Sequence, residues 1–146
     1  MPAEIRSEAV VAAAPETVHE LLVDIGSWAL WSPHIASVEP ERGQVAAGDV
    51  VQTRAFFSPA ATAMHVDEVM PARGLRWHST ALGHRLSYEN RVEPAPGGAR
   101  VTFVARIDGP AAGPLTLLTR SLSALGQRRR IARLGGLATL VEQRRA

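Results

Sequence analysis

The sequence contains no cysteine and no lysine, and it has no long uninterrupted run of apolar residues. The absence of cysteine excludes disulfides, thiolate metal ligands and a cysteine nucleophile. No apolar stretch approaches the ~18 residues that a membrane-spanning helix requires, so stable membrane insertion is not expected. The N-terminal segment carries Glu4 and Glu8 where a signal peptide has basic residues and an apolar stretch. These features favour a cytoplasmic protein.

The composition is typical of a soluble globular protein, with 46% hydrophobic and 21% charged residues among 146. A chain of this length can bury one sizeable core, and we expect a single domain over residues 1–146. All 16 basic residues are arginine, which together with abundant alanine indicates a GC-rich coding bias and a bacterial source.

Two periodicities alternate along the chain. Residues 5–11 alternate as a half-buried strand does, and residues 15–25 have helical spacing behind Pro15 and Glu16, which suit a helix start. Short alternating segments follow, separated by glycine and proline: 35–39, 49–57, 62–69, 75–80, 85–92 and 100–107. Helical spacing then returns after residue 114 and continues to the end. Its apolar positions, taken as one broad face, are Leu118, Leu122, Leu125, Leu134, Leu137 and Val141.

This order predicts an α+β fold. Strands joined by short turns pair as antiparallel hairpins, and a sheet of seven such strands with one apolar face needs a cover. Only the C-terminal helix is long enough to provide it. We therefore expect a seven-stranded antiparallel sheet curled around that helix, with a binding cavity in the space that the helix does not fill.

Several short motifs resemble those of a known family. They are residues 14–18 (APETV), 24–28 (DIGSW), 31–33 (WSP), 66–69 (VDEV), 75–77 (LRW) and 98–102 (GARVT). In this order and spacing the chain resembles the START-like (SRPBCC) helix-grip superfamily, and within it the polyketide cyclase/dehydrase branch. The resemblance implies a deep apolar cavity between sheet and helix. Members bind lipids, hormones or polyketides there, and some cyclise or dehydrate them.

Strand parity indicates which side chains face this cavity. When the arginines are placed on the outer face, each strand presents one apolar set inward. Glu68 shares the inward parity near a strand end, where a bulge would turn it outward. Together with the helix, this predicts a ligand-binding set of Thr53, Ala55, Phe57, Met64, Val66, Trp77, Tyr88, Asn90, Phe103, Leu118, Leu122 and Leu125.

Few side chains are suited to chemistry in the cavity. No acid is clearly inside, and no Ser-His-Asp arrangement is visible. The candidates for orienting a substrate by hydrogen bonds are Tyr88, Asn90, His34 and His84. For Tyr88 and Trp77 the alternative is core packing, and for the two histidines an ordinary loop position.

Other aromatic and imidazole groups have simpler interpretations. Trp28 and Trp31 either plug one end of the barrel or contact the ligand. His65 and His78 are expected on the outer face beside Asp67, without metal-ligand spacing, so neither a metal nor another cofactor is expected.

The C-terminal part is strongly basic. Residues 109–146 have a net charge of +6 and the remainder −4. The run Arg128–Arg130 forms a solvated face or contacts an anionic ligand or lipid headgroup; nucleic-acid binding is not expected, because no basic array with aromatics accompanies it. Gly135-Gly136 indicates a bend over the cavity or a close approach of the helix to the sheet or to a ligand.

Two main hypotheses on function remain. In the first, the protein binds a hydrophobic small molecule, lipid or polyketide-like, between the sheet and the C-terminal helix. In the second, it is a polyketide cyclase/aromatase or dehydratase acting on a ligand in the same cavity. A third, weaker hypothesis is an interaction protein that uses the outer sheet face or the basic helix. A monomer and a homodimer are both compatible with the sequence.

Overall fold

The computed structural model describes residues 3–56, 60–81 and 83–146. A first strand and a short helical region precede six strands and one long helix, the order that the sequence predicts. The elements are β1 (Ala3–Val11), α1 (Pro15–Val23), a 3-10 turn η1 (Ile25–Ser27), α2 (Trp28–Trp31), β2 (Ile35–Glu39), β3 (Val50–Ala55), β4 (Ala61–Met70), β5 (Gly74–Ala81), β6 (His84–Ala95), β7 (Gly98–Asp108) and α3 (Ala112–Arg145).

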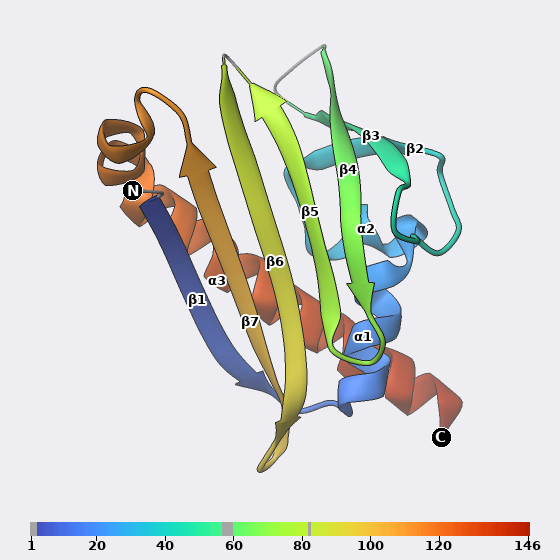
Figure 1. The fold of residues 1–146 in the computed structure, drawn as a ribbon. Helices are drawn as coiled ribbons and strands as arrows, with labels where there is room; N and C mark the ends of the chain where they lie inside the picture. Colours follow the sequence, from blue (N-terminus) through green and yellow to red (C-terminus); the bar gives the residue numbers. More distant parts are fainter. Residues whose placement is uncertain (1–2, 57–59, 82) are drawn as a thin grey trace.

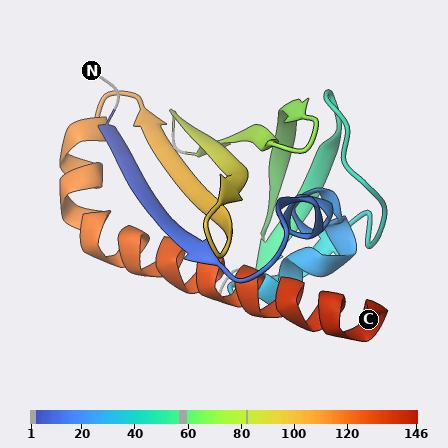
Figure 2. The same ribbon diagram turned by 90° about the horizontal axis from the view of Figure 1, so that it is seen from below.

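The strands form one antiparallel sheet in the order β1-β7-β6-β5-β4-β3-β2. Strands β2 to β7 follow one another as a meander, and β1 closes the order beside β7 (Figure 1). The sheet curls, and α3 runs across its concave side from the first residues of β1 to α1 (Figure 2). The predicted α+β helix-grip fold, a curled seven-stranded sheet around a long C-terminal helix, is confirmed.

A β-bulge interrupts the pairing of β4 with β5 between Val66 and Glu68. It turns the Glu68 side chain outward, as expected, where its Oε2 lies 3.3 Å from Arg76 Nη1. On the same outer face, Nδ1 of His78 lies 2.7 Å from Asp67 Oδ1, and the His65 and His78 rings stack with centroids 4.9 Å apart. The outer position predicted for both histidines is confirmed.

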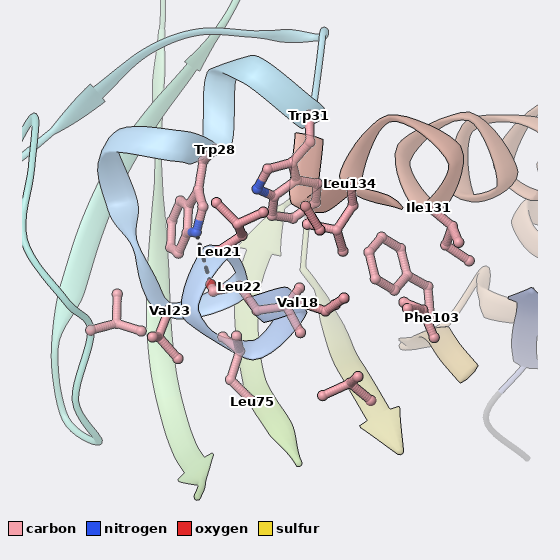
Figure 3. Close-up of a cluster of buried hydrophobic side chains, with 14 of the residues drawn as sticks. Val18, Leu21, Leu22, Val23, Trp28, Trp31, Leu75, Phe103, Ile131 and Leu134 are labelled. Carbon is pink, nitrogen blue, oxygen red and sulfur yellow. Dashed lines mark hydrogen bonds between the residues drawn. The ribbon is translucent and has the colours of Figure 1, made fainter. Parts of the chain in front are cut away.

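The core lies between the sheet, α1, α2 and the second half of α3 (Figure 3). Proline opens α1 at its first position, where its missing N–H leaves no donor unpaired. The indole of Trp28 donates from Nε1 to the carbonyl of Leu22 at 2.9 Å, which ties α2 to α1. From α3, Ile131 and Leu134 are fully buried in this cluster.

Buried and partly buried polar side chains attach α3 to β1 and to the start of α1. The buried Gln127 accepts a hydrogen bond from Ser7 Oγ at 2.7 Å and donates one to the carbonyl of Ile5 at 3.1 Å, both in β1. Near the C-terminus, Glu142 accepts from the backbone N–H of Ala14 and from Thr17 Oγ1, each at 2.9 Å. The helix is thus attached to β1 at its middle and to the start of α1 at its end.

The first half of α3 departs from the sequence expectation. Leu118, Leu122 and Leu125 are 81%, 75% and 44% exposed, whereas Leu134 is 0% exposed. The leucines do not form one face: at ~100° per residue, Leu125 lies about 180° around the helix from Leu134.

Among the helices that the structure describes, none combines the length and the apolar composition that a membrane-spanning helix needs.

Candidate functional site

A cavity of about 260 Å³ lies between α1, α2, the strands β3 to β6 and the middle of α3. The strands contribute most of its wall because alternate side chains of a curled sheet converge on the concave side. The lining residues are Leu22, Trp28, Trp31, Ser32, His34, Ile35, Thr53, Ala55, Thr62, Met64, Leu75, Trp77, Ser79, Ala81, Leu86, Tyr88, Asn90 and Arg130.

Aromatic rings form two sides of the cavity. Trp77 and Tyr88 are directly paired across β5 and β6, and their rings stack with centroids 3.9 Å apart. Trp77 Nε1 donates to Asn90 Oδ1 at 3.2 Å, which fixes the indole on the wall. Trp28 and Trp31 are buried and close the opposite end, where the Trp31 ring meets Phe103 with centroids 5.9 Å apart.

Two titratable groups on the wall remain uncharged near neutral pH. Burial, and secondarily the charge of Arg130, lowers the pKa of His34 below its ordinary value. The Nδ1 atom of His34 lies 3.3 Å from Ser32 Oγ, which orients the ring. Burial raises the pKa of Tyr88, so its phenol keeps its proton and can donate a hydrogen bond. Among the residues that the structure describes, those that line the cavity include no aspartate or glutamate.

Arg130 lines the cavity, and the sequence did not distinguish it from its neighbours in the cluster. Its guanidinium carbon lies 5.8 Å from the centroid of the Phe103 ring, and its Nε donates to the carbonyl of Gly126 at 3.3 Å. Arg128 and Arg129 on the same turn are exposed. The signal that identifies Arg130 is its position four residues before Leu134, about 40° from the buried face.

A groove of about 700 Å³ continues from the cavity beneath the first half of α3. Five residues line both spaces: His34, Trp77, Leu86, Tyr88 and Arg130. Beyond this junction, the strands supply a mainly apolar wall that also includes Arg106, and α3 supplies a mainly polar one that includes Arg129. In the α3 wall, the hydroxyl of the buried Thr116 has no hydrogen-bond partner among the described residues. The site is therefore elongated, with Arg130 at its middle.

The structure places the predicted site residues in different positions. Thr53, Ala55, Met64, Trp77, Tyr88, Asn90 and His34 line the cavity, and Leu122 lines the groove. Val66 and Phe103 are buried in the core and line neither space. Phe57 lies outside the described residues. A role in ligand binding or chemistry stays a prediction for every residue of the set.

Three further residues of the predicted set, Leu118, Leu125 and His84, also line neither space. Leu118 and Leu125 line neither the cavity nor the groove, because they point away from the sheet. His84 begins β6 at the far end of the sheet and lines neither space. Its Nε2 accepts a hydrogen bond from the backbone N–H of Ala111 at 3.1 Å, which fastens the connection between β7 and α3.

Comparison with protein families agrees with this geometry. Residues 2–142 match the model of a family described as polyketide cyclase/dehydrase and lipid transport. The chain belongs to this family. Membership in the polyketide cyclase/dehydrase and lipid transport family confirms the resemblance found in the sequence. No curated protein matches the chain significantly.

Solved structures show the same fold at low sequence identity. Protein MLL2253 from Mesorhizobium loti is 14% identical, with a TM-score of 0.74 over 92% of this chain and 96% of its own. The di-domain ARO/CYC StfQ from the steffimycin biosynthetic pathway is 12% identical, with a TM-score of 0.76 over 98% of this chain and 52% of its own. DynU16, a putative protein in the dynemicin biosynthetic locus, is 16% identical, with a TM-score of 0.69 over 90% and 45%.

Proposed function

We propose that this member of the polyketide cyclase/dehydrase and lipid transport family binds a hydrophobic small molecule between the sheet and α3. The observation that carries the proposal is the cavity of about 260 Å³, walled by Trp28, Trp31, Trp77 and Tyr88 and continuous with a larger groove. Binding sites for small molecules are concave and mostly apolar, with a few convergent polar groups. Here His34, Tyr88 and Arg130 supply those polar groups.

The size and lining of the site indicate the kind of ligand. The cavity alone lies just below the ~300 Å³ at which pockets for drug-sized ligands begin. A compact aromatic or branched apolar body fits such a volume, and a longer one extends past Arg130 into the groove. Apolar side chains from β6, β7 and β1 continue along that path: Leu86, Ala105, Ile107 and Ile5.

A pair of matched substitutions tests this proposal. Ala55 lies at the end of β3 and lines the cavity, whereas Ala61 on the neighbouring β4 is exposed and does not. Because the phenyl ring of Ala55→Phe would occupy ligand space, we expect it to weaken binding of the neutral fluorophore N-phenylnaphthylamine by about tenfold or more, equivalent to ~1.4 kcal/mol. Binding is measured by fluorescence titration.

Ala61→Phe adds the same ring outside the cavity and serves as the control, with the affinity of the unaltered protein expected. Circular dichroism and a thermal melt of each variant check that the fold is retained. Absence of fluorophore binding by the unaltered protein, or equal affinity in both variants, would contradict binding in this cavity.

A second candidate function is that of a cyclase or dehydratase in the same cavity. The observation that favours it is the position of His34 on the cavity wall beside Arg130. Because the pKa of His34 is lowered, its imidazole is neutral and is able to accept a proton from a substrate. Intramolecular aldol cyclisation of a poly-β-ketone moves one proton from a carbon acid to a carbonyl oxygen, and an imidazole can relay it. The similar structures StfQ and DynU16, one from a biosynthetic pathway and one from a biosynthetic locus, support this alternative. This function would be established if the protein cyclised a poly-β-ketone and if His34→Gln lost that activity while still binding N-phenylnaphthylamine.

A further inference from the structure

A cationic side chain lies at the junction between the mainly apolar cavity and the groove. Arg130 lines both the cavity and the groove, and it is the only arginine that lines the cavity within the described residues. It comes from the buried face of α3, one turn before Leu134, so the backbone of a well-packed helix fixes its position. The apolar surroundings of a cation call for a physical explanation.

No counter-ion for Arg130 is visible in the part of the chain that the structure describes. None of the ion pairs there includes it, and the acids that pair with other arginines lie on the outer face or at the edges. Burial lowers the pKa of Arg130, but a guanidinium starts so high that it keeps its charge. A charge that is partly desolvated and unpaired costs free energy, which a bound anion would offset.

The contacts of Arg130 leave its hydrogen-bonding edge available. Its Nε donates to the carbonyl of Gly126, and the group lies over the Phe103 ring. Among the described residues, no hydrogen bond engages its two terminal nitrogens. A planar guanidinium presents these donors as a fork that matches the two oxygens of a carboxylate.

Neighbouring groups favour the same kind of ligand atom. Tyr88 lines the junction with Arg130, and its protonated phenol is a hydrogen-bond donor. Among the described residues, neither lining includes an aspartate or glutamate, so an anion would meet no repulsion from a carboxylate there. Apolar side chains of the sheet extend from the junction into both the cavity and the groove.

We propose that Arg130, with Tyr88 beside it, forms a subsite for the carboxylate of an apolar organic acid, whose body occupies the cavity or the groove. The inference rests on the proposed binding function and adds the ligand's charge to it. An aromatic or aliphatic monocarboxylic acid is the chemical class that satisfies both the apolar walls of the cavity and the one arginine that lines it among the described residues.

The test compares an acid with the alcohol of the same skeleton. Phenylbutanoate and phenylbutanol are titrated, at pH 7, against protein loaded with the neutral fluorophore N-phenylnaphthylamine. Because hydrogen bonds to charged groups are worth more than neutral ones, we expect the acid to displace the fluorophore at a concentration about tenfold or more lower than the alcohol. Displacement at equal concentrations would overturn the proposal, whereas failure of the fluorophore to bind at all would instead contradict the binding function.

Two substitutions locate the effect. Arg130→Gln removes the charge and is expected to abolish the preference for the acid over the alcohol, with both ligands compared against the fluorophore affinity of the variant itself. Arg128→Gln, an exposed position two residues away that lines neither space, removes the same charge and is expected to keep the preference. Loss of the preference in both variants would show that it comes from the general charge of α3 and would overturn the subsite.

A second variant serves if Arg130→Gln does not fold. Arg130→Lys keeps the charge but lacks the planar fork of donors, so it is expected to weaken binding of the acid and not of the alcohol. An unchanged preference in Arg130→Lys would contradict the bidentate subsite.

Discussion

Leu134→Ala is expected to lower the free energy of unfolding by about 3 kcal/mol, the middle of the range for a leucine buried in a well-packed core. Leu134 is 0% exposed and lies in the cluster that joins α3 to α1, α2 and the sheet. The substitution would leave a cavity that rigid neighbours on three sides cannot close. Urea denaturation followed by circular dichroism measures the loss.

Leu118→Ala is the matched control for this substitution. Leu118 lies on the same helix but is 81% exposed, so the same change should alter the free energy of unfolding by no more than about 0.5 kcal/mol. Similar losses in the two variants would mean that the first half of α3 is packed against something, in contradiction to the structure.

The two adjacent glycines of α3 should respond in opposite directions when each is replaced by alanine. A Cβ at Gly135 would lie 2.5 Å from Val11 Cγ1 and 2.8 Å from Val11 Cβ, so β1 and α3 would have to separate. Overpacking of this kind costs typically ~1–3 kcal/mol and exceeds the ~1 kcal/mol gained from the better helix propensity of alanine. We expect Gly135→Ala to destabilise the protein by about 1 kcal/mol net.

Gly136→Ala adds its methyl group where no atom lies within 4 Å, on the exposed side of the helix. It should therefore stabilise the protein by up to about 1 kcal/mol through helix propensity alone. Thermal and urea unfolding of both variants measure these changes in the free energy of unfolding. Stabilisation by both substitutions would show that the close contact between Gly135 and Val11 does not exist in solution.

The fold was predictable because each strand carries its own signal. Alternation of apolar and polar residues, with turns rich in glycine and proline, indicated all seven strands, and parity placed Trp77, Tyr88 and Asn90 on the concave side. Even the outward turn of Glu68 followed from a general property of strand ends. Local patterns sufficed because an antiparallel meander is built from neighbouring segments.

Long-range features were less accessible to sequence reasoning. The leucines of α3 were assigned to one face on the assumption that leucine points toward the sheet, whereas the helical phase of Leu118 and Leu125 differs from that of Leu134. The inner face of the first half instead carries Thr116 and Gln127, which composition alone would place in solvent. The amide of Gln127 is accommodated in the interior because Ser7 and the carbonyl of Ile5 lie opposite it, and the sequence does not show these partners.

Arg130 was hidden for a related reason. In a run of three arginines, charge gives no indication of which one turns inward. Only the phase relative to a known buried position separates Arg130 from Arg128 and Arg129. This helical phase, which the sequence alone does not reveal, places the charge of Arg130 in the middle of the site.

The most direct test of ligand binding between sheet and helix is the ¹H–¹⁵N spectrum of the protein during titration with N-phenylnaphthylamine. The chain has three tryptophans, and all three line the cavity, so their indole N–H signals report on it directly. We predict that these signals shift together and reach their final positions at one equivalent of ligand, and that Ala55→Phe requires a larger excess of ligand to give the same shifts. Unchanged indole signals, with shifts confined to the exposed leucines of α3 or to the outer face of the sheet, would contradict a binding site in the cavity.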